Sequence, residues 1–329
     1  MLHELLVPAE AAGERLDVWL ERQLEGCSRS LVARCIKAGR CTMQPGTVKP
    51  GWRLRGGERI AIEVPDIPDL DVVGETMPLS ILYEDEALLV LDKPPGLVVH
   101  PAIGHPRGTL LNGLVAYAGG AWTPLQIHRL DADTSGVMAV AKHPTAQAVC
   151  QDAFRQRRVG KAYIAMVQGR PRSDYDEHGG AIGHSRRDFR KRCVVADDAP
   201  GAKPACTRFW VVDRQAAYTV VVARPVTGRT HQIRVHCADR HHPCLADGLY
   251  GPSDRWPVAV DQPARLTRHA LHAWWLALPH PQGGVLLVSQ PPPADMAALL
   301  TAWQPGPPRC AMFDAEQVPD GPQPWLPPE

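Results

Sequence analysis

Two segments near the N-terminus place apolar residues at the spacing of an amphipathic helix. In residues 15–24 the apolar positions fall on one stripe at i, i+3, i+4 and i+8: Leu16, Trp19, Leu20 and Leu24. This pattern predicts a short helix. A second helix is predicted over 28–39, because Ser28 is a favourable N-cap and Gly39 a favourable stop. Short strands separated by turns are expected from 41 to 64.

The second predicted helix is basic on the side opposite its apolar residues. Its cations are Arg29, Arg34, Lys37 and Arg40. Such a stripe suits a helix that binds nucleic acid, since the cations stay hydrated until phosphates replace the water. A solvated helix face without a ligand explains the same pattern equally well, so both interpretations stay open here.

The middle of the chain indicates a linker followed by a second, mixed domain. The stretch 66–79 is acidic, contains proline and lacks periodicity, which is typical of a linker. Residues 81–93 then predict a β-hairpin, and 144–159 carry the clearest helical pattern, with Pro144 in the first turn. Further segments are β-like: KAYIAMVQG, YTVVVARPV and GVLLVSQ. The predicted fold class is therefore α+β.

Composition and charge fit a globular protein of two domains. Of the 329 residues 44% are hydrophobic, which allows a sizeable core, and the formal net charge is +1. The charge is uneven, because residues 95–250 hold 21 Lys and Arg against 12 Asp and Glu. A basic middle permits a phosphate-bearing partner. Residues 304–329 are rich in proline and are predicted to be an extended tail.

The cysteines and the N-terminus bear on the cellular compartment. Nine cysteines without any C-x-x-C pair argue against a disulfide scaffold or a zinc ribbon. The N-terminus lacks the cationic and apolar regions of a signal peptide, and no segment approaches the ~20 apolar residues of a membrane span. We therefore expect a soluble, cytoplasmic protein that does not act at a membrane.

Three segments are more polar than folding requires. HRLDADTSG (128–136) suggests a tight turn that presents one carboxylate, although a surface ion pair explains it as simply. TGRTHQIRVH (227–236) carries Arg229 and Arg234, which are costly in a core unless they meet a carboxylate or a phosphate. The third candidate is Tyr163, the single tyrosine of KAYIAMVQG.

Together these segments resemble the RluA family of RNA pseudouridine synthases, and its RluD-like members most closely. The motifs occur in the family's order: LDKPPGLVVHP (91–101), HRLDADTSGVMAVAK (128–142), RRVGKAYIAMVQG (157–169), TGRTHQIRVH (227–236), HPCLADGLYG (242–251) and RHALHAW (268–274). The N-terminal helices with GTVKPGWRLRGGERIAIEV resemble the S4 RNA-binding domain. The resemblance implies an S4-like domain at 1–65 and, after the linker, a catalytic domain at 80–303 with a mainly antiparallel sheet.

The resemblance also implies a role for individual residues. Asp131 is the expected catalytic aspartate of an enzyme that converts uridine to pseudouridine without a cofactor. Its carboxylate attacks C6 of the uracil or C1′ of the ribose, or takes a proton from the sugar, and the sequence does not choose. Arg234 is expected to pair with Asp131 and keep it ionised. Tyr163 is expected to stack on the base and, with a well-placed oxygen, to help remove the C5 proton.

RNA is the expected partner. Arg129 is expected to fill the space that the extruded nucleotide leaves. The other expected RNA-binding residues are Arg29, Arg34, Lys37 and Arg229. Large-subunit ribosomal RNA is the favoured substrate and transfer RNA the alternative, with no metal and no small-molecule cofactor. The sequence does not set the oligomeric state, and a monomer is compatible with it. Arg234→Met is expected to impair turnover more than folding.

Some positions depart from the family's pattern. Ala132 follows the aspartate where lysine is common, so one cation is missing. Ala246 replaces the usual glycine of a Gly-Asp turn and tests whether that turn needs positive φ. In the S4-like segment Gln44-Pro45-Gly46 stands where an Asn-Gly turn is usual.

Three other interpretations compete with this one. A zinc site is suggested by a cluster of ligand-type residues: His231, His236, Cys237, His241, His242 and Cys244. The cluster lacks paired ligand spacing, and both cysteines are predicted to flank strands. Asp131 and Asp133 form a glycosidase-like carboxylate pair in the second interpretation, although Asp133 is expected to order the turn through backbone N–H groups. The third is a non-catalytic RNA-binding protein with the same fold.

Overall fold

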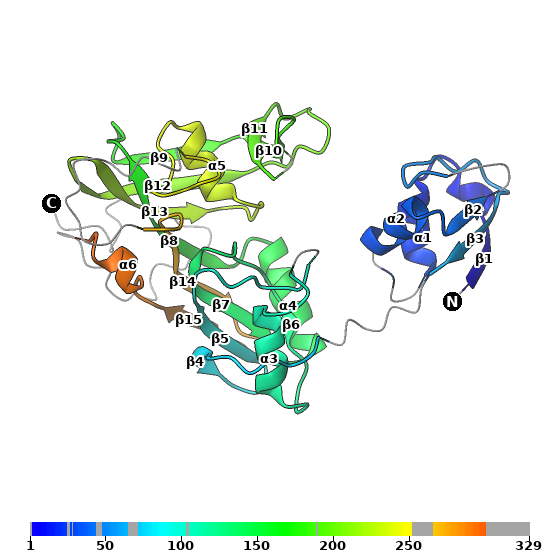
Figure 1. Cartoon of the computed structure of the whole chain (residues 1–329), viewed down its shortest axis with the longest axis horizontal. Helices are drawn as coiled ribbons and strands as arrows, with labels where there is room; N and C mark the ends of the chain where they lie inside the picture. Colours follow the sequence, from blue (N-terminus) through cyan, green and yellow to red (C-terminus); the bar gives the residue numbers. More distant parts are fainter. Residues whose placement is uncertain are drawn as a thin grey trace. The chain divides into compact units, whose positions relative to one another are not determined.

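The computed structural model describes residues 2–24, 27, 29–43, 48–64, 72–102, 105–188, 190–251 and 266–300. The chain divides into two compact units, Met1–Asp71 and Val72–Glu329 (Figure 1), each with its own hydrophobic core. No helix in the described ranges is both long and apolar enough to cross a bilayer. Predicted features outside the described residues are Ser28, the Gln44-Pro45-Gly46 turn and the tail at 304–329.

The first unit consists of a three-stranded antiparallel sheet and two helices. Its elements are β1 (Leu2–Leu6), the 3-10 turn η1 (Ala9–Ala11), α1 (Leu16–Gln23), α2 (Arg29–Lys37), β2 (Cys41–Met43) and β3 (Arg59–Glu63). The strands lie in the order β1–β3–β2. All four residues of the apolar stripe predicted in 15–24 are buried in this core, which confirms the first predicted helix.

Helix α2 confirms the second predicted helix. It ends before Gly39, which has a φ of +75°. Glycine adopts this angle without steric cost because it has no Cβ. Lys37, in its last turn, is exposed. The side chains of Arg29 and Arg34 lie outside the described part of the structure, so the placement of these two cations stays a prediction.

The second unit is built on one long sheet. Its strands are β4 (Ser80–Glu84), β5 (Leu88–Lys93), β6 (Leu125–Gln126), β7 (Ser135–Ala141), β8 (Gly160–Gln168), β9 (Tyr175–Gly179), β12 (Cys206–Arg214), β13 (Tyr218–Pro225), β14 (Leu271–Pro279) and β15 (Val285–Ser289). The main path is β4–β5–β7–β14–β8–β13–β12–β9, with β6 beside β7 and β15 beside β14. The described pairings are antiparallel except β7–β14, so the prediction of a mainly antiparallel sheet is confirmed.

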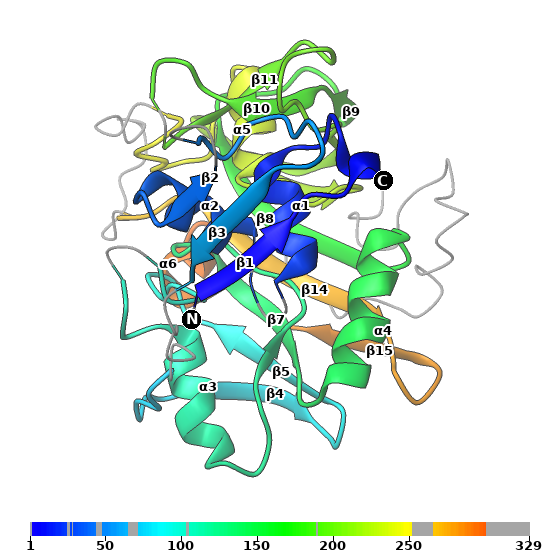
Figure 2. The ribbon, with the colours of Figure 1, turned by 90° about the vertical axis from the view of Figure 1, so that its right-hand side faces the viewer.

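Helices cover both faces of this sheet (Figure 2). They are α3 (Leu110–Ala118), α4 (Pro144–Arg155), α5 (Gln232–Asp239) and α6 (Ala294–Ala297). Successive strand residues point to opposite faces, and Met138 of β7 packs with α3 whereas Ala139 packs with α4. Helices α5 and α6 likewise cover opposite faces of β8 and β13. Tyr163 of β8 packs against both the α3 core and the α5 core.

Two details of the second unit differ from the sequence prediction. Helix α4 ends at Arg155 rather than near 159, because Arg157 takes a φ of +60°. The predicted linker spans 66–79, but its described part packs along α3. There the Asn112 side chain donates to the Val73 carbonyl oxygen at 2.9 Å, which fixes this stretch on the second unit.

Candidate active site

The loop between β6 and β7 presents one carboxylate. Leu130 is buried and anchors the loop in the core. The Thr134 N–H donates to the Asp131 carbonyl oxygen at 3.1 Å and closes the turn, while the Asp131 side chain is 20% exposed. The predicted turn-ordering role of Asp133 is wrong, because its carboxylate is exposed and accepts no hydrogen bond from the described residues. The backbone of Asp133 instead accepts a bond from Arg268 Nη1 at 3.1 Å.

A buried lysine supports this loop. Lys93, the last residue of β5, is fully buried, and its ammonium donates to the carbonyl oxygens of Pro94, Leu97 and Ala132 at 2.8, 2.9 and 2.7 Å. Burial lowers the pKa of Lys93 to about 8, against the opposite effect of nearby carboxylates. The group is therefore charged at neutral pH and ties the Asp131 loop to β5.

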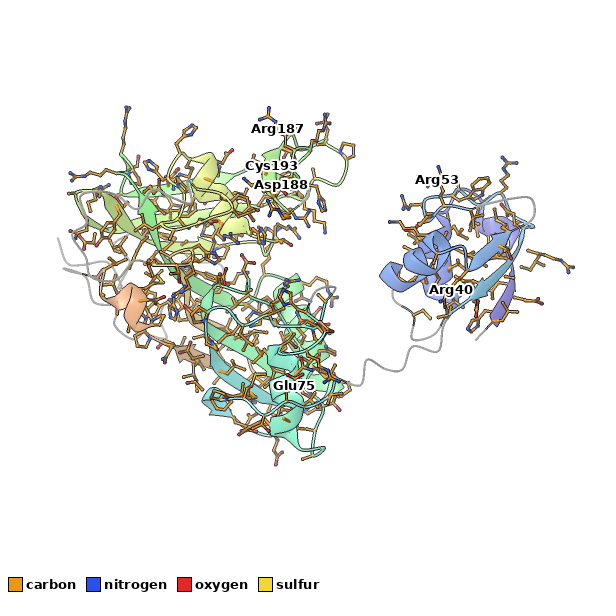
Figure 3. The ribbon with its side chains drawn as sticks, viewed as in Figure 1. Arg40, Arg53, Glu75, Arg187, Asp188 and Cys193 are labelled. Carbon is orange, nitrogen blue, oxygen red and sulfur yellow. The ribbon has the colours of Figure 1, made fainter. Side chains whose placement is uncertain are left out.

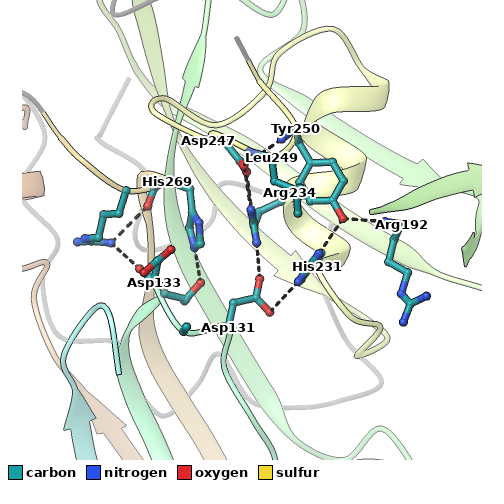
Figure 4. A network of polar contacts seen from close by, with 12 residues as sticks. Asp131, Asp133, Arg192, His231, Arg234, Asp247, Leu249, Tyr250 and His269 are labelled. Atoms are coloured by element: carbon teal, nitrogen blue, oxygen red, sulfur yellow. Dashed lines mark hydrogen bonds and ion pairs between the residues drawn. The ribbon is translucent and has the colours of Figure 1, made fainter. Parts of the chain in front are cut away.

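Arg234 of α5 joins two carboxylates (Figure 4). Its Nη1 donates to Asp131 Oδ2 at 3.0 Å, which confirms the predicted pairing. Its Nε and Nη2 donate to the two oxygens of Asp247 at 2.7 and 2.8 Å. Burial acts to lower the pKa of Arg234, but Asp247 and Asp131 together raise it, so the guanidinium stays charged. Arg234 in turn holds the pKa of the buried Asp247 below its usual range, although burial opposes this.

His231 lies on the other side of Asp131. Its Nε2 is 3.9 Å from Asp131 Oδ1, beyond hydrogen-bonding distance, and its Nδ1 is 2.7 Å from Tyr250 Oη. Because Tyr250 Oη accepts the Arg192 N–H at 2.9 Å, we assign the tyrosine hydrogen to His231 Nδ1 and the ring proton to Nε2. Burial lowers the pKa of His231, so this ring is neutral. Asp131 Oδ1 thus has no hydrogen bond from any described residue.

A cavity of about 320 Å³ opens beside Asp131. Its apolar and aromatic lining includes Leu130, Phe154, Tyr163, Ile233 and Leu271. Burial and the charge of Asp131 raise the pKa of Tyr163 well above its usual value, so the phenol is protonated at neutral pH. A second hollow of about 500 Å³ shares Asp131, His231 and Arg234 with the first. A cavity of this size that is lined by both a carboxylate and an aromatic ring suits an extruded nucleotide.

The cations predicted to bind RNA are distributed over both units. Arg129 is exposed and lines both hollows. Arg229 lines the first, and its Nε donates to the Pro204 carbonyl oxygen at 3.0 Å. A hairpin beside α5, formed by β10 (Ala181–His184) and β11 (Arg192–Val195), carries further exposed cations that sequence reasoning missed: Arg186, Arg187 and Arg190. Figure 3 shows Arg187 at the outer end of this hairpin.

The histidines and cysteines considered as a zinc site do not converge. No three His, Cys, Asp or Glu side chains within the described ranges are placed to hold a metal ion. Cys237 lies inside α5, so its predicted position beside a strand is wrong. His236 pairs with Thr207 Oγ1 at 2.9 Å through Nδ1.

Sequence reasoning did not single out Lys93, Asp247 or Tyr250. All three lie inside segments already recognised as motifs, LDKPPGLVVHP and HPCLADGLYG. For Lys93 a local signal exists. This lysine directly follows the apolar run ALLVLD of a buried strand, and a lysine is rarely buried unless its charge has partners. For Asp247 no local signal exists, since its partner Arg234 is known only once the chain has folded.

The mainly antiparallel sheet and the pair of Asp131 with Arg234 are what the family resemblance predicts, and comparisons with known proteins show the class. Residues 87–239 match the family described as RNA pseudouridylate synthase. The solved structure of human RNA Pseudouridylate Synthase Domain Containing 1 has a TM-score of 0.54 and 30% identity, over 67% of this chain and 86% of that one. An uncharacterized RNA pseudouridine synthase of Synechocystis sp. is 36% identical, over 90% of this chain and 93% of its own. The chain belongs to the RNA pseudouridine synthase family.

Within the family, the resemblance to RluD-like members is confirmed. Proteins named ribosomal large subunit pseudouridine synthase D, from Nitrosomonas europaea and Xanthomonas campestris, are 39% and 37% identical to this chain. The matches cover 91% and 92% of this chain, and 87% and 92% of those proteins. The protein is thus an RluD-like enzyme of the RluA family, an RNA pseudouridine synthase.

Proposed function

We propose that the enzyme modifies large-subunit ribosomal RNA and that Asp131 is its catalytic residue. The names of the two relatives and the basic segment 95–250 support this substrate. One observation carries the catalytic assignment. Arg234 holds Asp131 Oδ2, while Oδ1, which accepts no hydrogen bond from the described residues, borders a cavity of nucleotide size.

The reaction needs no second reactant. The N1–C1′ bond breaks, C5 joins C1′, C5 gives up a proton and N1 gains one. Asp131 Oδ1 is free to attack or to take a proton, and Arg234 fixes the carboxylate while this happens. Tyr163 offers its ring to the base, and its protonated phenol accepts the C5 proton only as it releases its own. Arg129, exposed beside both hollows, enters the vacated space in the RNA.

We also propose that the first unit is an S4-like RNA-binding module. Two helices against a three-stranded sheet, with the exposed Lys37 on α2, support this assignment. Arg29 and Arg34 would add to the same basic face.

Tritium release from RNA labelled with [5-³H]uridine tests the proposal. Large-subunit ribosomal RNA, small-subunit ribosomal RNA and transfer RNA from cells lacking the gene serve as substrates. We expect release from large-subunit RNA by the wild type, and none by Asp131→Asn, which removes the negative charge of the carboxylate but keeps the shape of the side chain. A thermal melt and RNA binding show whether this variant is folded.

Each other outcome has a defined meaning. Release from transfer RNA alone would establish the alternative substrate. Binding without release by the wild type would make the chain a non-catalytic RNA-binding protein. Full activity of Asp131→Asn would remove Asp131 from the mechanism.

A further inference from the structure

Two cations in the first cavity have no carboxylate partner among the described residues. Lys161, near the start of β8, uses one of its three N–H groups, which donates to the Thr227 carbonyl oxygen at 3.2 Å. Within the part of the chain that the structure describes, the Arg229 guanidinium donates only to the Pro204 carbonyl oxygen, through Nε at 3.0 Å. Among the described residues no ion pair joins either cation to an acid, and both line the same cavity as Asp131.

Burial makes an unpaired charge on Lys161 costly. Its Nζ lies over the Phe154 ring, 5.7 Å from the ring centre, and this cation–π contact offsets only part of the cost, because the ring supplies no hydrogen-bond acceptor of the kind that water offers. His128, also in the cavity wall, is neutral, because burial lowers its pKa to about 3. Burial, together with the charge of Arg229, lowers the pKa of Lys161 to about 8. An anion placed between the two cations would relieve both their repulsion and their lack of acceptors.

Two other lysines of the second unit have acceptors for their ammonium groups and serve for comparison. Lys93 donates to three carbonyl oxygens. Lys142 pairs with Glu84 at 2.9 Å. Lys161 has neither arrangement, so its remaining donors face the cavity without an acceptor from the described residues.

We propose that Lys161 and Arg229 bind a backbone phosphate next to the target uridine. The proposal rests on the proposed function, and it assigns one end of the cavity to the phosphate and the other, at Asp131 and Tyr163, to the sugar and base. A phosphodiester carries one charge and two free oxygens, which suits two cations that each keep N–H groups without an acceptor from the described residues. The site would hold the extruded nucleotide in place while its base is detached.

The test measures binding in the Asp131→Asn background, so that no reaction occurs. The reference is a short RNA that contains one uridine on which the enzyme acts. It is compared with versions that carry a neutral methylphosphonate on the 5′ or on the 3′ side of that uridine. In every RNA, the riboses preceding these two linkages carry 2′-O-methyl groups. We expect Lys161→Met to weaken binding of the all-phosphate RNA about 10-fold. For one of the two methylphosphonate RNAs, the same substitution should weaken binding less than 2-fold further, because the phosphate that Lys161 binds is already neutral.

The controls separate the phosphate site from general effects. Arg229→Gln should behave as Lys161→Met does, whereas Lys142→Met, which removes a lysine that already has a carboxylate partner, should leave affinity unchanged. If the effects of Lys161→Met and of each methylphosphonate simply multiply, the site does not exist. Tritium release by the wild-type enzyme is scored separately, so the proposed function stands or falls on its own.

Discussion

At the scale of single residues, the buried Asp247 adds a loss of stability to the effect expected from substituting Arg234. From the sequence alone, Arg234→Met is expected to impair turnover more than folding. In the structure, this change also leaves Asp247 buried without its partner, and breaking such a pair costs about 3–5 kcal/mol. We therefore expect Arg234→Met to abolish tritium release and to lower the free energy of unfolding in urea by about 3–5 kcal/mol.

The double variant Arg234→Met with Asp247→Leu separates the two effects. It removes the uncompensated carboxylate, so it should recover most of the lost stability while turnover stays absent, because Asp131 still lacks its partner. Wild-type stability of Arg234→Met would contradict the buried pair. Turnover restored in the double variant would show that Arg234 acts only through folding.

Some of the site residues could be predicted from the sequence and others could not, because their partners lie far away along the chain. Asp131 and Arg234 lie 103 positions apart, and only the family resemblance brought them together. Asp247 acts through a partner that only the folded chain supplies, so no local pattern marks its role. The apolar run before Lys93 signals that this lysine is buried, but it does not show which carbonyl oxygens the ammonium binds. Ala246 is the opposite case. Its φ of +53° shows that the turn does need the left-handed region, at a cost to alanine of about 1 kcal/mol.

At the scale of elements, Lys93 links β5 to the loop that carries Asp131. Lys93→Met would remove the charged donor from three partly buried carbonyl oxygens, at about 1.5–3 kcal/mol for each lost hydrogen bond to a charged group. We expect kcat to fall at least 10-fold with KM little changed, because the loop shifts while the RNA-binding cations stay in place. Single-turnover and steady-state rates, taken well below the melting temperature, measure this split.

A core variant of similar stability is the matched control for Lys93→Met. Leu88 is fully buried on the same strand, and Leu88→Ala should cost about 2–5 kcal/mol. We expect it to keep a near-wild-type kcat. An equal loss of kcat in both variants would mean that Lys93 contributes stability alone.

The pattern of apolar residues predicted some elements and missed others. Helices α1, α2 and α4 each bury one face, so the period of 3.6 residues is visible in the sequence. Helix α5 was missed because residues 232–237 are all buried, polar and apolar alike, which erases the contrast between faces. Strand β1 was missed because it exposes Leu2 and Leu6, so its alternation does not separate apolar from polar positions.

At the scale of the whole molecule, the two units have separate cores, and we expect them to contribute differently to turnover and to RNA affinity. The second unit holds Asp131, both hollows and the basic hairpin tip at 186–190. The first unit has no described residue in either hollow, so its contribution to function is expected in RNA affinity rather than in turnover. The salt dependence of binding measures that contribution, because each phosphate contact makes the negative slope of log K against log salt steeper by about 0.7–0.9.

Substitutions in the 329-residue chain offer a matched test of the first unit. Lys37 and Arg40 are exposed at the end of α2, whereas Arg55 and Arg59 are exposed on or beside β3. We expect Lys37→Ala with Arg40→Ala to reduce the salt slope by about 2, while kcat at saturating RNA is unchanged. Arg55→Ala with Arg59→Ala removes the same charge and should leave the slope nearly as it was. Equal losses from both pairs would mean that the unit attracts RNA through its overall charge, and no loss from either would contradict an RNA-binding role for α2.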